Sequence, residues 1–199
     1  MNVGALIPEL TEEQIKLFQQ YHFDAEDFTL LRSKLKQGLF PLNQNIINQS
    51  LRVPCHTDFI DLLKPSPSAK VRMEQIGEDA MSRGEVGFVI LNGGMATRFG
   101  GMVKGTVEVF DSYSFLNLKL LNIQKSCPNA HVFLLNSFAT NASTRMHLAM
   151  PPNKSLQNKL NLHPVLQSIS VRLNPDGTTF VDSQGQPSLY APGHGDIFK

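Results

Sequence analysis

Residues 86–105 read VGFVILNGGMATRFGGMVKG, in which an apolar run leads directly into a glycine-rich loop. The run Val86–Leu91 is continuously apolar, a pattern typical of a strand buried in a parallel sheet. Paired glycines after such a strand let the backbone approach a ligand, because no Cβ stands in the way. Successive N–H groups in a turn of this kind form an anion-binding concavity, and Arg98 and Lys104 lie on the same loop. The stretch therefore predicts a buried strand that ends in a polyphosphate-binding loop, Leu91–Gly105.

Two standard phosphate-loop patterns are absent from this sequence. It has no G-x-x-x-x-G-K-[ST] segment and no G-x-G-x-x-G after the strand, so neither a Walker-type loop nor a dinucleotide-binding loop is expected. The alternative interpretation is a flexible connection whose cations are only solvated. The position at the carboxyl end of a predicted strand, where ligands bind in α/β sheets, favours the binding loop.

Beyond the loop, apolar patterns and turn residues predict alternating strands and helices. Phe115–Ser126 is apolar nearly all round, so we expect this helix to pack on a sheet over a broad face. Asp176-Gly177 predicts a turn into a hairpin arm at Thr178–Val181. The succession of strands and helices is typical of an α/β sheet, here expected to be Rossmann-like and incomplete. The predicted strands are residues 86–91, 106–110, 131–136 and 167–173, and the predicted helices are 115–126 and 140–149, the second stopped by Pro151-Pro152.

The chain before the first strand is expected to be helical at its start. Thr11 and Gln14 form a capping-box pattern that begins one helix, and Asp24 can cap a second. The asparagine-rich stretch Gly38–Ser50 is expected to be a loop. No period-two alternation interrupts this part, and we expect its helices to pack against the sheet.

A further helix is expected directly before the first strand. Ser68 is predicted to cap it, and it should run to Arg83 and end at Gly84. We therefore divide the chain into an N-terminal helical segment, residues 1–65, and a part with the α/β pattern, residues 66–199.

The composition narrows the class of protein. Of 199 residues, 41% are hydrophobic and 18% charged, with a net charge of +1, so the chain can form a core. No basic face of the kind that binds nucleic acid is visible. No apolar run approaches the ~20 residues of a membrane helix, and the N-terminus lacks a signal-peptide pattern. Cys55 and Cys127 are expected to be reduced thiols, which indicates a cytoplasmic protein.

Three motifs in a fixed order resemble one family. Leu91–Gly94 is Leu-Asn-Gly-Gly, Asn136–Thr140 is Asn-Ser-Phe-Ala-Thr, and Pro192–Asp196 is Pro-Gly-His-Gly-Asp. Together they are similar to the UDP-glucose pyrophosphorylase branch of the nucleotidyltransferases that make nucleoside-diphosphate sugars. The likeness spans about residue 86 to the last residue, the N-terminal part of that family's catalytic domain. Two departures are Ala96, where the family has Gly, and Val103, which replaces the usual Pro.

The resemblance implies a set of site residues. Gln167 would read the uracil edge, although a polar residue at a strand entry is an equally open interpretation. His194 would contact the nucleotide or the sugar phosphate, whereas Asp196 is expected to hold its turn by bonding backbone amides. The expected catalytic residues are Lys104 and Arg98, of which Arg98 follows the wider superfamily and is absent from typical eukaryotic members. The expected nucleotide-binding residues are Leu91, Asn92, Gly93, Gly94, Lys104, Gln167 and Gly193.

The resemblance also implies an activity, in which UTP and glucose 1-phosphate give UDP-glucose and pyrophosphate with the help of Mg²⁺. The family's acidic metal ligand lies on a later strand, so it is expected beyond residue 199 and no residue of this chain is assigned to the metal. The chain is accordingly expected to be an N-terminal fragment without turnover of its own. The remaining histidines show no metal-ligand spacing and are expected to be structural or solvated: His22, His56, His131, His147 and His163.

Two alternatives to this activity stay open at the level of sequence. One is a UDP-N-acetylhexosamine or broad UDP-sugar pyrophosphorylase. The other is a non-catalytic nucleotide-binding module derived from the family. The sequence indicates no particular oligomeric state.

Overall fold

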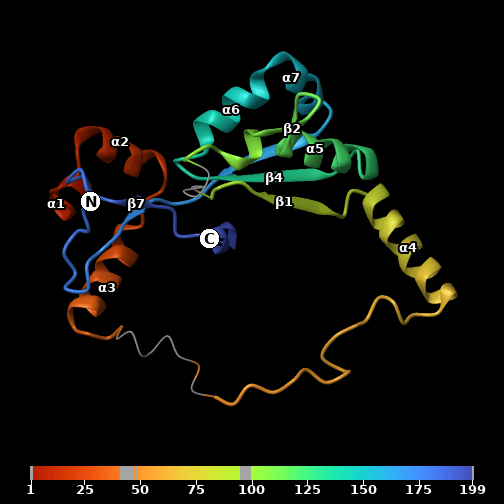
Figure 1. The fold of residues 1–199 in the computed structure, drawn as a ribbon, viewed down its shortest axis with the longest axis horizontal. Helices are drawn as coiled ribbons and strands as arrows, with labels where there is room; N and C mark the ends of the chain where they lie inside the picture. The colour runs from red at the N-terminus through yellow and green to blue at the C-terminus, as the bar shows by residue number, and fades with distance from the viewer. Residues whose placement is uncertain (1, 41–46, 48, 95–99, 199) are drawn as a thin grey trace.

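The computed structural model describes residues 2–40, 47, 49–94 and 100–198 and has a mixed α/β architecture (Figure 1). Its helices are α1 (Val3–Leu6), α2 (Glu12–Gln20), α3 (Ala25–Lys36), α4 (Pro67–Ser82), α5 (Phe115–Ser126), α6 (Asn141–Ala149) and α7 (Pro151–Gln157), with short 3₁₀ helices η3 (Lys104–Thr106) and η4 (His194–Phe198). Its strands are β1 (Gly87–Leu91), β2 (Glu108–Phe110), β3 (Tyr113–Ser114), β4 (His131–Asn136), β5 (Asn161–Leu166), β6 (Ser170–Val171) and β7 (Leu189–Tyr190).

A parallel three-stranded sheet with the order β1-β4-β5 forms the centre of the α/β part. Helix α5 connects β1 to β4, and α6 and α7 connect β4 to β5, so that all three cover the same face (Figure 1). Val132 and Leu134 of β4 share a hydrophobic core with Leu116 and Leu120 of α5. The predicted α/β class is confirmed, and β4 and α5 have the bounds expected from the sequence.

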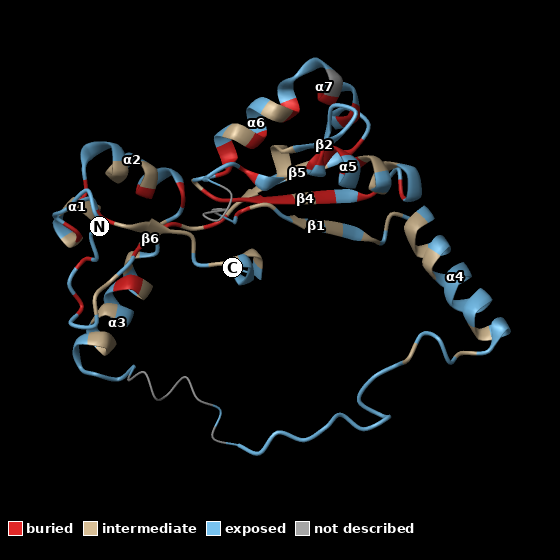
Figure 2. Ribbon diagram, viewed as in Figure 1, coloured by how far each residue is buried: buried red, intermediate tan, exposed pale blue. Residues whose placement is uncertain are grey.

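The first strand is less buried than its apolar sequence predicts. β1 lies at the edge of the sheet, and Val89 and Leu91 are 49% and 53% exposed (Figure 2). The reason is that the helices of the described part cover only the opposite face. Helix α5 packs on the sheet as predicted, through Leu116, Leu120, Leu121 and Ile123. Its packing face is narrower than the apolar pattern predicts, because Phe115 and Leu118 remain exposed.

The third parallel strand was placed wrongly by the sequence pattern. The strand is β5, which the pattern missed, whereas the predicted strand at 167–173 is reduced to β6, paired antiparallel with β7. Pro164 lies within β5 opposite Leu134, and it masks the strand in the sequence because proline lacks a ladder N–H. β5 tolerates it because β5 is an edge strand of the sheet.

Three further predicted elements are present with changed bounds or pairing: the strand at 106–110, the helix at 140–149 and the hairpin after Asp176. The strand expected at 106–110 is shortened to β2, which pairs antiparallel with β3 outside the parallel sheet, since Thr106 belongs to η3. α6 ends as predicted, but Pro151 starts α7, where a proline in the first turn is well tolerated. The predicted hairpin exists as isolated antiparallel bridges, Leu173–Thr179 and Val181–Pro187.

The N-terminal helices pack against β6 and its neighbours. The capping box of Thr11 and Gln14 and the Asp24 cap form as predicted. The core on this side of the molecule joins both sequence segments and comprises Ile7, Leu10, Phe18, Tyr21, Phe28, Ile169 and Val171. The helices therefore bury the chain that follows β5 rather than a face of the parallel sheet.

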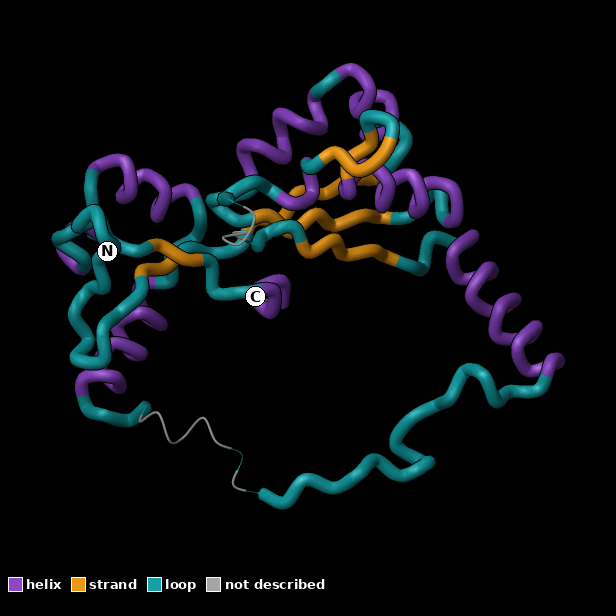
Figure 3. The backbone as a smooth tube through the Cα atoms, in the orientation of Figure 1, coloured by secondary structure: helices purple, strands orange, loops and turns teal. Residues whose placement is uncertain are grey.

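Helix α4 and the chain that leads to it lie apart from both cores. Its cap is Ser66, which accepts from the N–H of Ala69, and not Ser68 as expected, because Pro67 takes the first helical position. Gly84 ends the helix as predicted, with a left-handed φ of 70°. From residue 49 to Ser66 the chain is loop (Figure 3). Among the described helices, none has the length and apolar character needed to cross a membrane.

Candidate nucleotide-binding site

The carboxyl ends of the three parallel strands bring the predicted motifs together. β1 and β4 end in register at Leu91 and Leu135, and β4 and β5 end in register at Asn136 and Leu166. The segments that leave these strands therefore start side by side. They are Asn92–Gly94 after β1, Asn136–Thr140 after β4 and Gln167 after β5, which is the edge of an α/β sheet where ligands bind.

Asn92 joins these segments through its side chain. Its Nδ2 donates to Asn136 Oδ1 at 2.8 Å and to Thr144 Oγ1 at 2.9 Å, and its backbone N–H donates to Leu135 O at 2.9 Å. Its Oδ1 lies against the Cα of Gly105, where a Cβ would overlap it. Both amide hydrogens of Asn92 are thus engaged within the protein, so its side chain holds the glycine loop in place.

Gln167 is buried, with 1% of its surface exposed. Its Nε2 donates to the carbonyl of Gly193 at 2.7 Å. Because a carbonyl only accepts, the amide must turn its NH₂ toward Gly193, and its Oε1 then faces Gly93. This Oε1 is buried and has no hydrogen-bond partner within the described residues.

Gly93 provides the space for that oxygen. A Cβ at this position would overlap Oε1 of Gln167, whereas Gly94 has open space around it. Gly93, Gln167 and Gly193 come from three distant stretches of sequence, and the structure brings all three into contact. Their role in nucleotide binding stays a prediction, as does that of Leu91, the last residue of β1, which is 53% exposed.

The predicted residues of the Pro192–Asp196 motif differ in their surroundings. Asp196 accepts hydrogen bonds from the backbone N–H of Ser168 and, at 2.7 Å, from its hydroxyl. It therefore bonds a backbone amide as expected, but that amide belongs to the segment after β5 and not to its own turn. His194 is exposed at the start of η4, and its contact with a phosphate stays a prediction.

The glycine loop itself is described only at its two ends. Arg98 and Ala96 lie outside the described residues. Gly100 and Gly101 have φ of 64° and 80°, the left-handed region that favours glycine. Lys104 is exposed at the start of η3, directly after the buried Val103. A cavity of about 550 Å³ borders this end of the loop, and Gly101, Thr106 and Ser143 contribute to its lining.

Ser114 and His147 form a hydrogen-bonded pair near the site, but the hydrogen bond runs in the direction opposite to the one that nucleophilic catalysis needs, in which the imidazole accepts the serine proton. Ser114 Oγ donates to Asn117 Oδ1 at 2.7 Å, so His147 Nε2, at 2.8 Å from Ser114 Oγ, must carry a proton and donate it. Burial lowers the pKa of His147 below its usual value of 6.5. We interpret this pair as a structural network that closes the first turn of α5, in line with the expected structural role of His147.

Sequence reasoning missed three polar residues that build the site, namely Asn136 as a hydrogen-bond acceptor, Thr144 and Ser168. Each is a small polar residue in an otherwise ordinary context, and only its distance to Asn92 or Asp196 reveals its role. Within the described residues, no group of three or more His, Cys, Asp or Glu side chains is arranged to hold a metal ion.

Comparison with known proteins agrees with this geometry. The model of the family described as UTP–glucose-1-phosphate uridylyltransferase matches residues 42–199, which include every segment of the site. The chain belongs to the UTP–glucose-1-phosphate uridylyltransferase family. The resemblance seen in its three motifs is thereby confirmed. The first 41 residues, which include α1, α2 and α3, lie outside the matched region.

Individual members of the uridylyltransferase family align with part of this chain. The enzyme of that name from Saccharomyces cerevisiae is 28% identical over 165 residues, 77% of this chain and 32% of the relative. The one from Musa acuminata is 31% identical over 116 residues, 54% of this chain and 24% of the relative. The chain thus spans about a quarter to a third of the length of these relatives.

A solved structure supports the fold. The crystal structure of a UDP-N-acetylglucosamine pyrophosphorylase from Entamoeba histolytica superposes with a TM-score of 0.53 at 19% identity, over 66% of this chain and 36% of that one. At this identity the likeness concerns the fold alone. It agrees with the nucleotide-sugar transferase fold expected from the sequence.

Proposed function

We propose that this chain forms the nucleotide-binding part of an enzyme that makes UDP-glucose and pyrophosphate from UTP and glucose 1-phosphate. The observation that carries the proposal is the contact of Gln167 with Gly193 and Gly93 at the carboxyl edge of the sheet. Membership of the uridylyltransferase family supports it. Nucleic acid and membrane are not needed as partners in this reaction.

The buried Oε1 of Gln167 suits a uracil base. Uracil presents an N–H at N3, whereas cytosine presents an acceptor there, so a fixed amide oxygen favours the imide. A buried acceptor that lacks a partner costs about 1–3 kcal/mol, which a ligand N–H would recover. Gly193 lies beside this position and is the second residue that we assign to the base.

The phosphates of UTP are assigned to the loop that follows β1. Backbone N–H groups of Gly93 and Gly94 would bind phosphate oxygens, and Lys104 and Arg98 would neutralise their charge. An oxygen of the sugar phosphate, which we assign to His194, would attack the α-phosphorus in line. The new P–O bond forms as the bond to the leaving pyrophosphate breaks, so the protein acts by positioning and by charge stabilisation.

Reactions of this class use Mg²⁺, which supplies Lewis-acid stabilisation of the phosphates when bound. The described residues do not offer a fitting set of ligands, since no cluster of three acidic, His or Cys side chains occurs among them. We therefore assign no step to the metal here and propose that its acidic ligand follows residue 199. We also propose that the enzyme is cytoplasmic and serves carbohydrate metabolism; its two free cysteines suit the reducing compartment but do not bear on the metabolic role.

Calorimetry with the 199-residue chain tests the binding part of the proposal. UTP should bind, CTP should bind more weakly, and a chain that binds neither would contradict the assignment of the site. The complete natural protein should release pyrophosphate from UTP with glucose 1-phosphate. A preference for N-acetylglucosamine 1-phosphate would replace the proposed sugar, and binding without turnover would favour the non-catalytic module.

A further inference from the structure

Asp196 connects the two segments that meet at Gln167. Its backbone N–H donates to the carbonyl of Gly193 at 3.2 Å, which closes the turn of the Pro192–Asp196 motif. Its carboxylate accepts from the N–H and the hydroxyl of Ser168, the residue directly after Gln167. One residue thus holds both the carbonyl that binds the Gln167 amide and the backbone that carries Gln167.

The contacts form a two-point clamp, which we define as the Gln167–Gly193 and Ser168–Asp196 hydrogen bonds. The backbone N–H of Gln167 donates to the carbonyl of Asn136 at 2.8 Å, so the main chain is held at β4, and the clamp acts on the side chain of Gln167 and on the residue after it. Two adjacent contacts to the same turn fix the direction of the Gln167 side chain relative to Gly193. Gly193 has a φ of 123°, a conformation reserved for glycine, so the turn presents its carbonyl in a specific direction.

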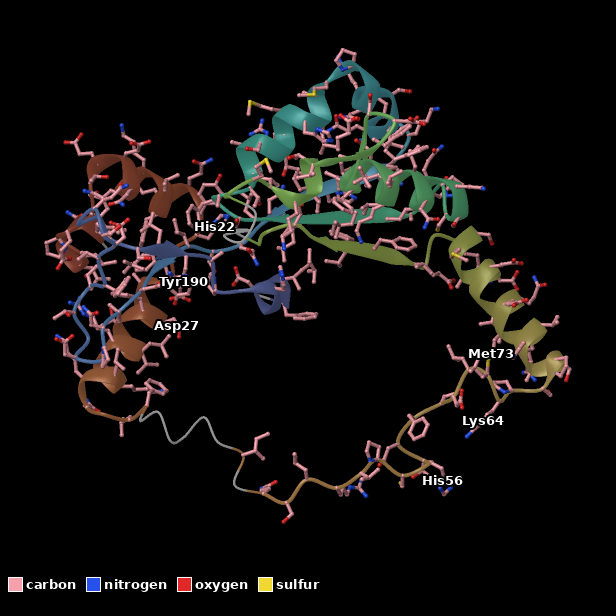
Figure 4. All side chains as sticks on the ribbon, in the orientation of Figure 1. His22, Asp27, His56, Lys64, Met73 and Tyr190 are labelled. Carbon is pink, nitrogen blue, oxygen red and sulfur yellow. The ribbon has the colours of Figure 1, made fainter. Side chains whose placement is uncertain are left out.

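The clamp lies between a cavity and the core of the N-terminal helices. A cavity of about 350 Å³ lies beside it, lined in part by His22, Asp24, Ser168 and Asp196. In the view of Figure 4, His22 and Tyr190 both lie on the side of the N-terminal helices. The residue after Ser168, Ile169, is 1% exposed in the core of those helices. Ser168 is therefore held on one side by the core and on the other by Asp196.

We propose that Asp196 is a positioning residue for base recognition, which holds Gln167 in the orientation that turns its Oε1 toward Gly93. This role rests on the proposed nucleotide site. Asp196 does not touch the base in this assignment and acts through Ser168 and Gly193. Its removal should release the Gln167 amide, which could then present either its oxygen or its NH₂ to a ligand.

The test compares Asp196→Ala with Asp176→Ala as a matched control. Asp176 also accepts from a backbone N–H and a hydroxyl, those of Thr178, but it lies in the hairpin turn away from the site. Calorimetry with UTP and CTP should show that the ratio of their affinities falls about tenfold in Asp196→Ala, the worth of one good hydrogen bond between Gln167 and the base. Asp176→Ala should keep the ratio of the unchanged chain. Ser168→Ala, which loses the hydroxyl contact only, should fall between them.

A second readout needs no nucleotide. The side-chain NH₂ of Gln167 should give protected, slowly exchanging NMR signals in the unchanged chain and in Asp176→Ala, and these signals should lose protection in Asp196→Ala. If UTP and CTP weaken equally in Asp196→Ala while protection persists, Asp196 is merely structural and the inference is wrong. If the unchanged chain binds neither nucleotide, the proposed function fails, and the NMR comparison alone decides whether Asp196 positions Gln167.

Discussion

Asn92 and Asn136 join the ends of β1 and β4 through an Nδ2–H···Oδ1 hydrogen bond of 2.8 Å. The same Nδ2 reaches Thr144 of α6 at 2.9 Å. One side chain thus ties together two strand ends and a helix at the edge where the proposed ligand binds. Asn92 therefore affects the site by fixing the start of the glycine loop. Because its backbone N–H donates to Leu135 O, its predicted contact with the nucleotide would come from its backbone carbonyl.

Replacing Asn92 should destabilise the chain. Asn92→Leu keeps the approximate volume but removes both donors, and it leaves buried oxygens of Asn136 and Thr144 without this partner. We expect a loss of about 1–3 kcal/mol in the free energy of unfolding, measured by urea denaturation. Asn161→Leu is the control, since the Asn161 amide is exposed and makes one 3.2 Å contact. Equal stability of the two variants would contradict the role of Asn92.

Gly93→Ala should displace Gln167. The new Cβ would overlap Oε1 of Gln167, and that side chain is too buried to move without disturbing its contact with Gly193. We expect UTP affinity to fall about tenfold, as for loss of one good hydrogen bond to the ligand, and the melting temperature to fall as well. Gly94→Ala, with open space at its Cβ, should leave the melting temperature unchanged. A Gly93→Ala chain with unchanged UTP binding would argue against the base site.

The sequence predicted those elements whose signals are local. The cap of α2 forms between Thr11 and Gln14, three residues apart, and the bounds of α5 are framed by Ser114 and Cys127. Both depend on neighbours along the chain, so periodicity and capping patterns suffice to find them. Gly93, Gln167 and Gly193 could be singled out because the family pattern consists of short contiguous stretches, and their role in nucleotide binding stays a prediction.

What the sequence could not predict depends on distant contacts. Pro164 conceals β5, whose pairing partner Leu134 is contributed by another strand. Val89 has the side chain of a buried strand but lies on an uncovered face of the sheet. The orientation of the Gln167 amide is set by the carbonyl of Gly193, 26 residues away. Periodicity carries no information on which partner such a residue meets.

His147 should make stability depend on pH. Burial lowers its pKa below 6.5, so the unfolded chain binds its proton more readily than the folded chain does. Stability is therefore retained above about pH 6.5 and is lost as the pH falls through the folded-state pKa. His147→Gln should flatten this dependence between pH 7 and 5 in urea denaturation, and His56→Gln, in the exposed loop, should not. A slope that survives in His147→Gln would assign the effect to another group.

Lys104 should contribute to binding of the triphosphate. Its charge lies at the end of the glycine loop, so Lys104→Ala should weaken UTP binding about 10- to 100-fold, the range for a hydrogen bond to a charged group. In the complete enzyme, the rate should fall about 10²–10³-fold, as for removal of one transition-state donor. Lys119→Ala removes an equal charge from the exposed surface of α5 and serves as control. If both variants lose UTP affinity equally, the effect is one of net charge and not of the loop.

Phe18 should link the N-terminal helices to nucleotide binding, although it lies outside the matched family region. It is 1% exposed in the core that also buries Ile169, two residues after Gln167. Phe18→Ala should cost about 3–5 kcal/mol in unfolding free energy, as for other buried aromatic deletions. Because Ile169 then loses its support, UTP affinity should fall even under conditions where the chain stays folded. Leu30→Ala, at a position 52% exposed on α3, should change neither quantity. If Phe18→Ala lowers the free energy of unfolding but leaves the UTP affinity unchanged, the helices support the fold without supporting Gln167.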